Sequence, residues 1–263
     1  MKKTYDRILT FFKYRELFIQ LVIREIKIKY RKSILGYLWS VLNPLLTMIV
    51  LIIVFSNMFA RGVPNFPVYL LTGQLLFNFM VISTSRSLSS VVGNASLLKK
   101  IYVPKYIFTF SVVTSELITY LFSLGALLVV ILFTGAPVTW RYIFIIIPIV
   151  ELYVFCIGIG LFLAQVYVFF RDVEYIWSVI TTAWLYLSAI FYPVSVLPGK
   201  IYFLVTNLNP MYFYITIFRN FTIGGDNSGN FELIIRGAVT SVLALFLGLI
   251  SFSYSKKKFI LYM

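Results

Sequence analysis

Long runs of apolar residues, separated by short polar breaks, dominate this chain. A helix needs about 20 mostly apolar residues to cross a bilayer. Six runs approach or exceed that length, and they lie at approximately 35–59, 68–92, 106–133, 142–166, 175–192 and 232–253. The breaks between them contain Gly, Pro, Asn and Asp, which favour turns. The pattern predicts an all-α integral membrane protein with six transmembrane helices, forming a single transmembrane domain over residues 1–263.

The segment before the first run has the pattern of a helix that lies along the membrane surface. Over residues 4–32, apolar and basic positions recur at helical spacing on neighbouring faces. The apolar stripe is Ile19, Ile23, Ile26 and Tyr30, and the basic stripe is Arg24, Lys27 and Arg31. Two interpretations remain open. The helix either only anchors the first span, or its basic stripe binds an anionic lipid headgroup or a pyrophosphate.

The break between the second and third runs predicts a short amphipathic helix. Asn94 or Ser96 is a suitable N-cap, and Pro104 would end the helix at Val103. Leu97, Leu98 and Ile101 would then form an apolar knob among lysines. Such a knob suits docking into a groove on another protein, although spacing alone does not establish this.

The segment between the fifth and sixth runs divides at prolines into two pieces of helical length, about 199–208 and 210–222. Both are too short to cross a bilayer and both are rich in aromatic residues. Short helices at membrane depth are tolerated where protein or a water-filled cavity covers them. We therefore predict two short re-entrant helices that form an outer gate.

Composition supports a membrane protein and excludes several other classes. The 263 residues are 60% hydrophobic and only 12% charged, whereas a soluble domain is about a quarter charged. Histidine is absent, so sites and triads that depend on it are excluded. The single cysteine, Cys156, lies in an apolar run and is expected to be a small buried residue. We expect no catalytic residue, metal site or cofactor in this chain.

The net charge of +14 is explained by membrane orientation and not by nucleic acid. If both termini are cytoplasmic, 17 Lys and Arg residues lie on the cytoplasmic side and 5 on the other, while Arg86 lies within a span. Cytoplasmic loops carry such an excess of basic residues. This predicts a multi-pass membrane protein with both termini in the cytoplasm.

Three ionisable residues, Arg86, Glu116 and Glu151, fall within predicted spans. Charges at membrane depth are costly and are usually paired or face a cavity. Arg86 and Glu116 lie at comparable depth on the two arms of one hairpin, so they are expected to form an ion pair. The alternative is that they provide a polar lining for a transport path. Glu151 has no evident partner, and a carboxylate near mid-span would suit a wet channel.

Aromatic residues make up 19% of the chain and supply flat, C–H-rich surfaces with exchangeable hydrogen bonds, which suit the lining of a channel. Belts at the membrane interfaces are the competing interpretation for Trp39, Trp177 and Tyr192. Trp184, near mid-span, suits a pore or a dimer interface. The candidate channel or gate aromatics are Tyr37, Trp39, Phe55, Trp177, Trp184, Tyr186, Phe191 and Tyr192.

Four segments together resemble the type-2 ABC exporter permeases of the O-antigen polysaccharide and teichoic acid export subfamily. The resemblance covers essentially the whole chain. The segments are Arg24 to Trp39 with Leu42-Asn43-Pro44-Leu45, Val92 to Lys105, Phe169-Phe170-Arg171-Asp172-Val173, and Asn209-Pro210 followed by Arg219.

The resemblance implies a half-transporter, in which two copies of the permease form the channel and two separate subunits bind ATP and Mg²⁺. The absence of a G-x-x-x-x-G-K-[ST] motif from the sequence agrees with this. The implied substrate is a glycan linked to undecaprenyl pyrophosphate, entering through a lateral opening between spans one and five. By resemblance, the coupling helix that contacts the ATPase contains Asn94, Leu97, Leu98, Lys99, Lys100, Ile101, Tyr102 and Pro104.

Other functions fit the sequence less well. The same fold could carry a drug or a small lipid, but the short outer loops and the match at 92–105 favour a polymer. A membrane glycosyl- or acyltransferase would require a D-x-D site or a His/Asp pair, and the sequence has neither. An ion channel would require a filter-like loop or a charged ring, for which there is no candidate.

Overall fold

The computed structural model describes residues 13–31, 33–59, 63–100, 103–224 and 229–254. Every regular element within these ranges is a helix. In chain order they are α2 (Arg15–Tyr30), η1 (Gly36–Leu38), α3 (Trp39–Phe59), α4 (Phe66–Leu88), η3 (Val92–Asn94), α5 (Ala95–Leu98), α6 (Tyr106–Thr134), η4 (Trp140–Ile145), α7 (Ile146–Phe169), α8 (Val173–Tyr186), η5 (Val194–Val196), α9 (Gly199–Leu208), α10 (Pro210–Arg219), η6 (Asn220–Gly224) and α11 (Asn230–Tyr254).

Five of the described helices are long and apolar enough to cross a membrane, and a sixth crossing is possible if the bent pair α9–α10 counts as one span. The five lie at Gly36–Phe59, Phe66–Leu88, Tyr106–Thr134, Trp140–Phe169 and Asn230–Phe252. They correspond to the predicted runs one, two, three, four and six. The class of the protein, an all-α membrane protein, is therefore as predicted.

The fifth predicted span differs in extent from the helix in the structure. α8 has only 14 residues, about 21 Å of helix at 1.5 Å per residue, which is shorter than a hydrocarbon core of about 30 Å. The chain leaves the helix at Leu187, and Ala189 adopts a left-handed backbone with φ of 48°. Residues 187–192 are therefore turns and bends instead of the last part of a span.

The two short helices after this turn start where predicted, and α9 also ends where predicted, whereas α10 ends at Arg219 and η6 continues to Gly224 instead of ending at 222. α9 starts directly after Pro198, and α10 starts at Pro210, where proline's fixed φ suits the first helical turn. The Asn209 side chain accepts a hydrogen bond from the Met211 backbone N–H and caps α10. The two helices are bent by 80° relative to each other. Their predicted role as a gate stays a prediction.

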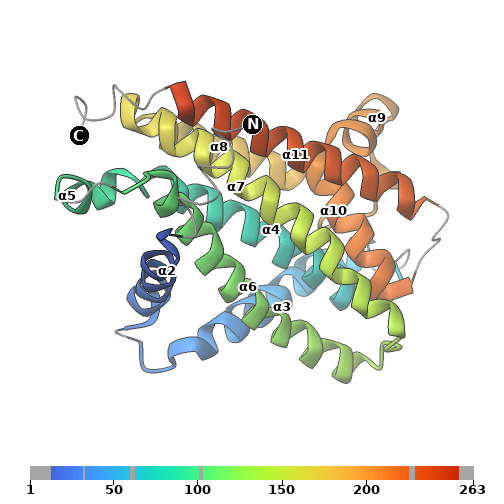
Figure 1. Cartoon of the computed structure of the whole chain (residues 1–263). Helices are drawn as coiled ribbons and strands as arrows, with labels where there is room; N and C mark the ends of the chain where they lie inside the picture. The colour runs from blue at the N-terminus through green and yellow to red at the C-terminus, as the bar shows by residue number, and fades with distance from the viewer. Residues whose placement is uncertain (1–12, 32, 60–62, 101–102, 225–228, 255–263) are drawn as a thin grey trace.

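α4 is the central helix of the bundle. In its most apolar window 72% of the residues are buried, against 17% for α3. α4 contacts α3, α6, α7, α8 and α10, and α7 and α11 run side by side along the bundle (Figure 1). The weakly buried α3 exposes a broad apolar surface, which suits lipid or a second protein.

Small residues let α7 and α11 approach closely. Gly158 of α7 lies directly against the backbone of Ala244, and Gly248 of α11 lies against the Gly158 carbonyl. A side chain at either glycine would collide with backbone of the other helix. This small-residue contact is how membrane helices pack without a hydrophobic driving force between them.

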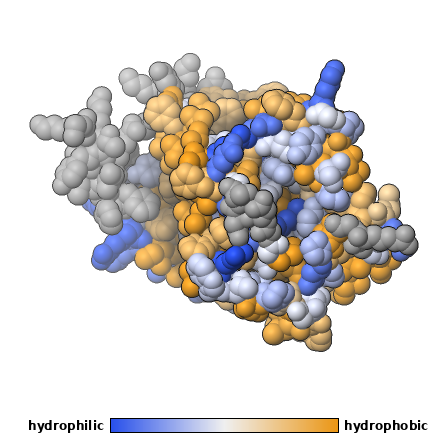
Figure 2. Space-filling model, turned by 90° about the vertical axis from the view of Figure 1, so that its right-hand side faces the viewer, coloured by the Kyte–Doolittle hydropathy of each residue, from blue (hydrophilic) through white to orange (hydrophobic). Residues whose placement is uncertain are grey.

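The two ends of the bundle differ in character. One end, called here the basic end, carries α2, α5 and the start of α8. The other, called the α9 end, carries α9, the turn at 187–196 and the end of α10 (Figure 1). Seen from the α9 end, hydrophilic residues gather near the middle of the face, with hydrophobic residues on its flanks (Figure 2).

Candidate functional site

A network of five charged side chains joins three helices at the basic end. Arg86 of α4 contacts both Glu25 of α2, at 2.8 Å, and Glu116 of α6. Lys29 of α2 also binds Glu116, at 2.8 Å, and Arg24 binds Glu25 at 2.7 Å. The structure thus contains the predicted contact between Arg86 and Glu116, within a larger cluster.

The carboxylates of this network are more buried than its cations. The side chains of Glu116 and Glu25 are 3% and 12% exposed, whereas those of Arg86 and Lys29 are 31% and 29% exposed. Each buried carboxylate contacts two cations, which offsets the cost of taking a charge out of water. The three cations exceed the two carboxylates by one, so the cluster keeps a net charge of +1.

The network continues into the segment between α4 and α6. Arg24 donates a hydrogen bond to Oδ1 of Asn94 at 2.8 Å, and the Asn94 amide donates to the Ser90 carbonyl at 2.8 Å. Asn94 stands at the N-cap position of α5 but makes no cap hydrogen bond. Its side chain instead ties η3 to α2, so a displacement of this segment would be felt by the surface helix.

The predicted stripes of α2 are redistributed by its packing against α6. The buried face consists of Leu21, Val22 and Glu25, while the Ile19 and Ile23 side chains stay exposed. The predicted basic stripe divides, because Arg24 turns into the network and Lys27 and Arg31 remain exposed. The exposed isoleucines and cations are available to a membrane surface, and the headgroup role stays a prediction.

The predicted coupling helix is shorter than expected and its leucines do not form an exposed knob. α5 covers only Ala95–Leu98. Leu97 and Leu98 are half-buried and pack on a small core formed by Leu21, Val103, Ile107 and Phe108. Leu97 and Leu98 were predicted to contact a partner protein, but in the structure they pack against α2 and α6. Lys99 and Lys100 are exposed at the surface, and Pro104 is half-buried. Ile101 and Tyr102, which were also predicted to belong to the coupling helix, lie outside the described residues.

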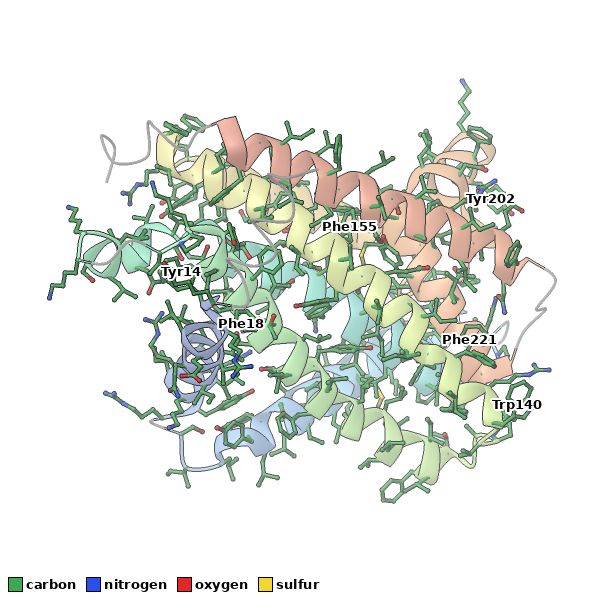
Figure 3. The ribbon with its side chains drawn as sticks, viewed as in Figure 1. Tyr14, Phe18, Trp140, Phe155, Tyr202 and Phe221 are labelled. Atoms are coloured by element: carbon green, nitrogen blue, oxygen red, sulfur yellow. The ribbon has the colours of Figure 1, made fainter. Side chains whose placement is uncertain are left out.

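Aromatic side chains lie at both ends of the bundle and inside it (Figure 3). Trp177 is buried against α4, where its indole N–H donates to the Thr84 hydroxyl at 3.1 Å. Trp177 and Trp184 meet edge to face at 6.5 Å, as expected for one helix face. The Trp184 indole donates to Asn209 at 2.7 Å. Both tryptophans thus hold α8 to its neighbours, and Trp177 is not part of an interfacial belt.

The remaining candidate aromatics form two groups. Phe191 lies beyond the end of α8, so it does not share a helix face with the tryptophans; it stacks on Phe55 of α3 at 5.1 Å. Tyr192 donates a hydrogen bond to the Tyr186 carbonyl. At the basic end, Tyr37 and Trp39 are 48% and 43% exposed at the start of the first span, whereas Tyr186, at the opposite end of α8, is 59% exposed. These exposed rings remain candidates for a transport path.

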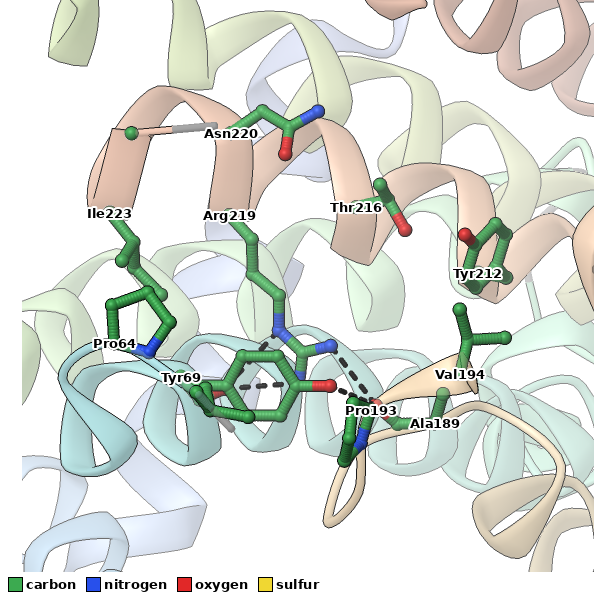
Figure 4. A pocket seen from close by; sticks show the side chains of 12 residues that line it. Pro64, Tyr69, Ala189, Pro193, Val194, Tyr212, Thr216, Arg219, Asn220 and Ile223 are labelled. Atoms are coloured by element: carbon green, nitrogen blue, oxygen red, sulfur yellow. Dashed lines mark hydrogen bonds between the residues drawn. The ribbon is translucent and has the colours of Figure 1, made fainter. Parts of the chain in front are cut away.

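Arg219 clamps the α9 end of the bundle. Its guanidinium donates hydrogen bonds to the carbonyls of Tyr69, Ala189 and Ile190 at 3.0–3.3 Å, and it lies over the Tyr69 ring at 3.4 Å (Figure 4). The Tyr69 hydroxyl in turn donates to the carbonyls of Ala189 and Tyr192. Arg219 therefore joins α10, α4 and the turn after α8, around a cavity of about 280 Å³.

The clamp explains two backbone features. Ala189 has a φ of 48°, an unfavourable conformation for a residue with a Cβ atom. Its carbonyl accepts hydrogen bonds from both Arg219 and Tyr69, which stabilise that conformation. Gly73 of α4 leaves room for the guanidinium, since a Cβ atom there would lie 2.7 Å from an Arg219 nitrogen.

Glu151 is buried and does not face a wet channel within this chain. It lies in α7, where α7, α10 and α11 meet, and its carboxylate is next to Gly237 of α11. Its Oε2 has no hydrogen-bond partner among the described residues, while its backbone carbonyl accepts from Ser241. The sequence predicted its depth but not this enclosure.

Several important residues were missed by reasoning from the sequence. The roles of Glu25 and Lys29 depend on how α2 docks on α6, and their local pattern resembles that of an exposed helix. Arg219 was noticed only as a basic residue and as part of a motif. Its position in the sequence does indicate a structural role, because burying an arginine at the end of an apolar helix costs free energy unless its guanidinium is bound.

The chain has clear similarities to known proteins. Residues 16–222 match the model of the ABC-2 type transporter family. An O-antigen export system permease protein, RfbA, of Myxococcus xanthus is 32% identical over 209 residues, covering 79% of this chain and 80% of that protein. RfbA of Klebsiella pneumoniae is 28% identical over 246 residues, 93% of each chain. The polysialic acid transport protein KpsM of Escherichia coli is 24% identical over 249 residues, covering 87% and 89%.

Proposed function

Because the chain belongs to the ABC-2 type transporter family, we propose that it is the channel-forming subunit of an ATP-driven exporter of a lipid-linked surface polysaccharide. The carrying observation is that the similarity to O-antigen permeases extends over nearly the whole chain. The buried charge network, which connects the surface helix to the segment before α6, supports a transport role. We assign no catalytic group to this chain.

In this proposal the basic end faces the cytoplasm and the α9 end faces outward. The support is the excess of Lys and Arg that the sequence assigns to the cytoplasmic side, 17 against 5 on the other side. Lys99, Lys100, Lys27 and Arg31 are exposed there. The protein is then an inner-membrane permease with both termini in the cytoplasm.

Two separate ATPase subunits, which bind ATP and Mg²⁺, would contact the segment 92–105. Ser96, Lys99 and Lys100 lie exposed on its surface. Asn94 would carry a movement of this segment to Arg24 of α2, and the network would carry it to α4 and α6. This gives a continuous chain of contacts between the partner's binding surface and the membrane-spanning helices.

A second copy of the chain would complete the transport path. Asn43 of α3 and Asn78 of α4 are both exposed on spanning helices, where a polar amide facing hydrocarbon would be costly. A facing copy would enclose such groups in a water-filled path. The substrate is a glycan linked to undecaprenyl pyrophosphate, and the surrounding partner is membrane lipid.

Site-directed cross-linking with purification tests the proposed assembly. A Lys100→Cys variant should capture an ATPase subunit with a short bifunctional reagent, whereas Ser195→Cys at the α9 end is the matched negative control, since both positions are exposed. ATP turnover of the captured complex should rise with an undecaprenyl-linked glycan. Absence of any ATPase partner would overturn the proposal, and stimulation by a small lipid alone would reassign the cargo.

A further inference from the structure

A cavity of about 200 Å³ lies beneath the surface helix, where α2, α3, α4 and α6 meet. It is separate from the cavity around Arg219. The charged groups on its wall are Lys29 and Glu116, which bind each other at 2.8 Å. The rest of its wall combines hydroxyls, side-chain amides and aromatic rings with the apolar side chains of Pro44, Leu75 and Ile82.

Two groups in this wall, the hydroxyls of Tyr30 and Tyr120, lack the partner that a buried polar atom requires among the described residues. Tyr120 of α6 is 4% exposed, and its hydroxyl has no hydrogen-bond partner among the described residues. Its ring packs on Phe79 of α4 at 5.3 Å, which fixes its position. A buried hydroxyl without a partner costs free energy, and a bound ligand with hydroxyl groups would remove that cost.

The neighbouring polar groups present acceptors. The hydroxyls of Ser40 and Ser123 donate to backbone carbonyls of their own helices, Tyr37 at 2.7 Å and Tyr120 at 2.6 Å. Their oxygen lone pairs therefore remain available. Tyr30, at the end of α2, lines the same wall, and burial, with the nearby charge of Glu116, raises the pKa of its hydroxyl. It stays neutral, so it can both donate and accept.

The cavity is accessible from the membrane-spanning surface. Asn43 and Asn78 line it and are exposed, and Trp39, 43% exposed, adds an indole face to the wall. Amides combined with an aromatic ring suit a sugar, whose hydroxyls bind the amides while its C–H face covers the ring.

The charge of the wall favours a neutral ligand over a phosphate. A phosphate is best bound by uncompensated Arg or Lys side chains. Here the single ammonium group of the wall is bound to Glu116 at 2.8 Å, and no other Lys or Arg among the described residues lines the cavity. A phospholipid headgroup or the pyrophosphate of a carrier therefore fits this wall less well than a sugar ring.

We propose that this cavity is a binding subsite for a neutral sugar residue of the transported glycan, with the Tyr120 hydroxyl as a specificity group. The inference rests on the proposed function, because only a glycan exporter brings sugars to this depth. The pyrophosphate binds elsewhere, and exposed Lys27 and Arg31 on α2 are the groups with suitable charge.

The test uses the assembled transporter, permease with its ATPase, in lipid nanodiscs. ATP turnover is measured against the concentration of an undecaprenyl-pyrophosphate-linked glycan, and separately against undecaprenyl pyrophosphate without sugar. The variants are Tyr120→Phe and Ser123→Ala. The matched control is Tyr153→Phe, which removes a hydroxyl bonded to Thr114 at 2.7 Å outside the cavity.

The sugar subsite predicts a selective change. Loss of one hydrogen bond should raise the half-saturating glycan concentration roughly three- to tenfold in Tyr120→Phe. The response of Tyr120→Phe to the sugar-free carrier should not shift, and the control Tyr153→Phe should match wild type in both basal turnover and glycan response. Without substrate, Tyr120→Phe should melt at the same temperature as wild type or higher, since it removes a hydroxyl that has no partner.

Three results would overturn the inference. An unchanged glycan response in both variants would do so, as would an equal shift for glycan and sugar-free carrier. A phospholipid retained by wild type but lost in Tyr120→Phe, detected by native mass spectrometry with an unchanged glycan response, would assign the cavity to phospholipid. If the ATP turnover of wild type does not respond to any lipid-linked glycan, the proposed function is wrong, and the inference of a sugar subsite is wrong with it.

Discussion

Arg86 holds two carboxylates that come from two different helices, Glu25 of α2 and Glu116 of α6. Removing this one cation would leave both acids with a single partner each, in largely buried positions. Each acid would then keep only one of its two cations, and the remaining ion pair would compensate less of the cost of burying the carboxylate. The network is therefore the place where single substitutions should have the largest effect on this end of the bundle.

Replacement of Arg86 by Met should lower the free energy of unfolding by about 2–4 kcal/mol. This loss is smaller than that expected for a fully buried ion pair, because the Arg86 side chain is 31% exposed. Arg236→Met is the control, since it removes an exposed i,i+4 ion pair with Glu232 and one hydrogen bond to Asn207, which together should contribute about 1 kcal/mol. Thermal melting of the purified variants in one detergent compares them. Equal losses in both would contradict the account.

Arg219→Lys should be destabilising although it keeps the charge. A lysine ammonium cannot reach three carbonyls in the fixed fork geometry of a guanidinium, so at least one buried carbonyl on the turn would lose its donor. We expect a loss of about 1–3 kcal/mol and faster proteolysis between residues 187 and 196. Gly73→Val should act similarly, because its side chain would displace the guanidinium. Unchanged melting in both variants would refute the clamp.

At this scale the sequence predicted contacts that follow from local geometry. Arg86 and Glu116 lie at similar depth on adjacent arms of a hairpin, so their pairing could be inferred by counting residues. Glu25 and Lys29 could not be placed, since their positions depend on the docking angle of α2. Tyr69 and Arg219 lie 150 residues apart, and no local pattern connects them.

The elements of this protein are held together mainly by close backbone packing and apolar contact. The α7–α11 contact depends on Gly158 and Gly248, where each helix meets the other's backbone. In a monomeric helix alanine is preferred over glycine by about 1 kcal/mol. A glycine-to-alanine substitution should therefore lower the free energy of unfolding where the glycine lies in a close helix contact, and raise it or leave it unchanged elsewhere.

Gly158→Ala should destabilise the protein and loosen α11, while Gly125→Ala should be neutral or stabilising. A Cβ atom at Gly125 would meet only the Val41 side chain at an ordinary 3.5 Å. Hydrogen exchange of α11, measured by mass spectrometry, and thermal melting separate the two variants. Faster exchange in Gly125→Ala, or no difference between them, would contradict the packing described for α7 and α11.

Element boundaries were predictable where the sequence marks them with proline. Pro198 and Pro210 define the starts of α9 and α10 within one residue. The end of α8 was not predictable, because residues 187–192 are apolar and contain no helix breaker. Their turn is stabilised by Arg219 and Tyr69, which come from distant parts of the chain. The inward orientation of Leu97 and Leu98 was likewise not predictable, because it depends on tertiary contacts with α2 and α6.

The whole molecule has an asymmetric distribution of charge that predicts its orientation in the membrane. With Cys156 replaced by Ala, single cysteines at Ser96 and Ser195 report the two ends, and both positions are exposed. In intact cells a membrane-impermeant maleimide should label Ser195→Cys, and it should label Ser96→Cys only after permeabilisation. The opposite pattern would reverse the orientation and exclude cytoplasmic ATPase docking at 92–105.

The central claim is that this chain provides the path by which an ATPase moves a lipid-linked polysaccharide across the membrane. The most direct measurement reconstitutes the chain with its ATPase in vesicles containing a fluorescent undecaprenyl-pyrophosphate-linked glycan. A membrane-impermeant quencher reports transfer between leaflets. We expect transfer that requires ATP, the ATPase and this chain together. Transfer that proceeds equally without the chain, or none with all components and ATP hydrolysis present, would contradict the claim.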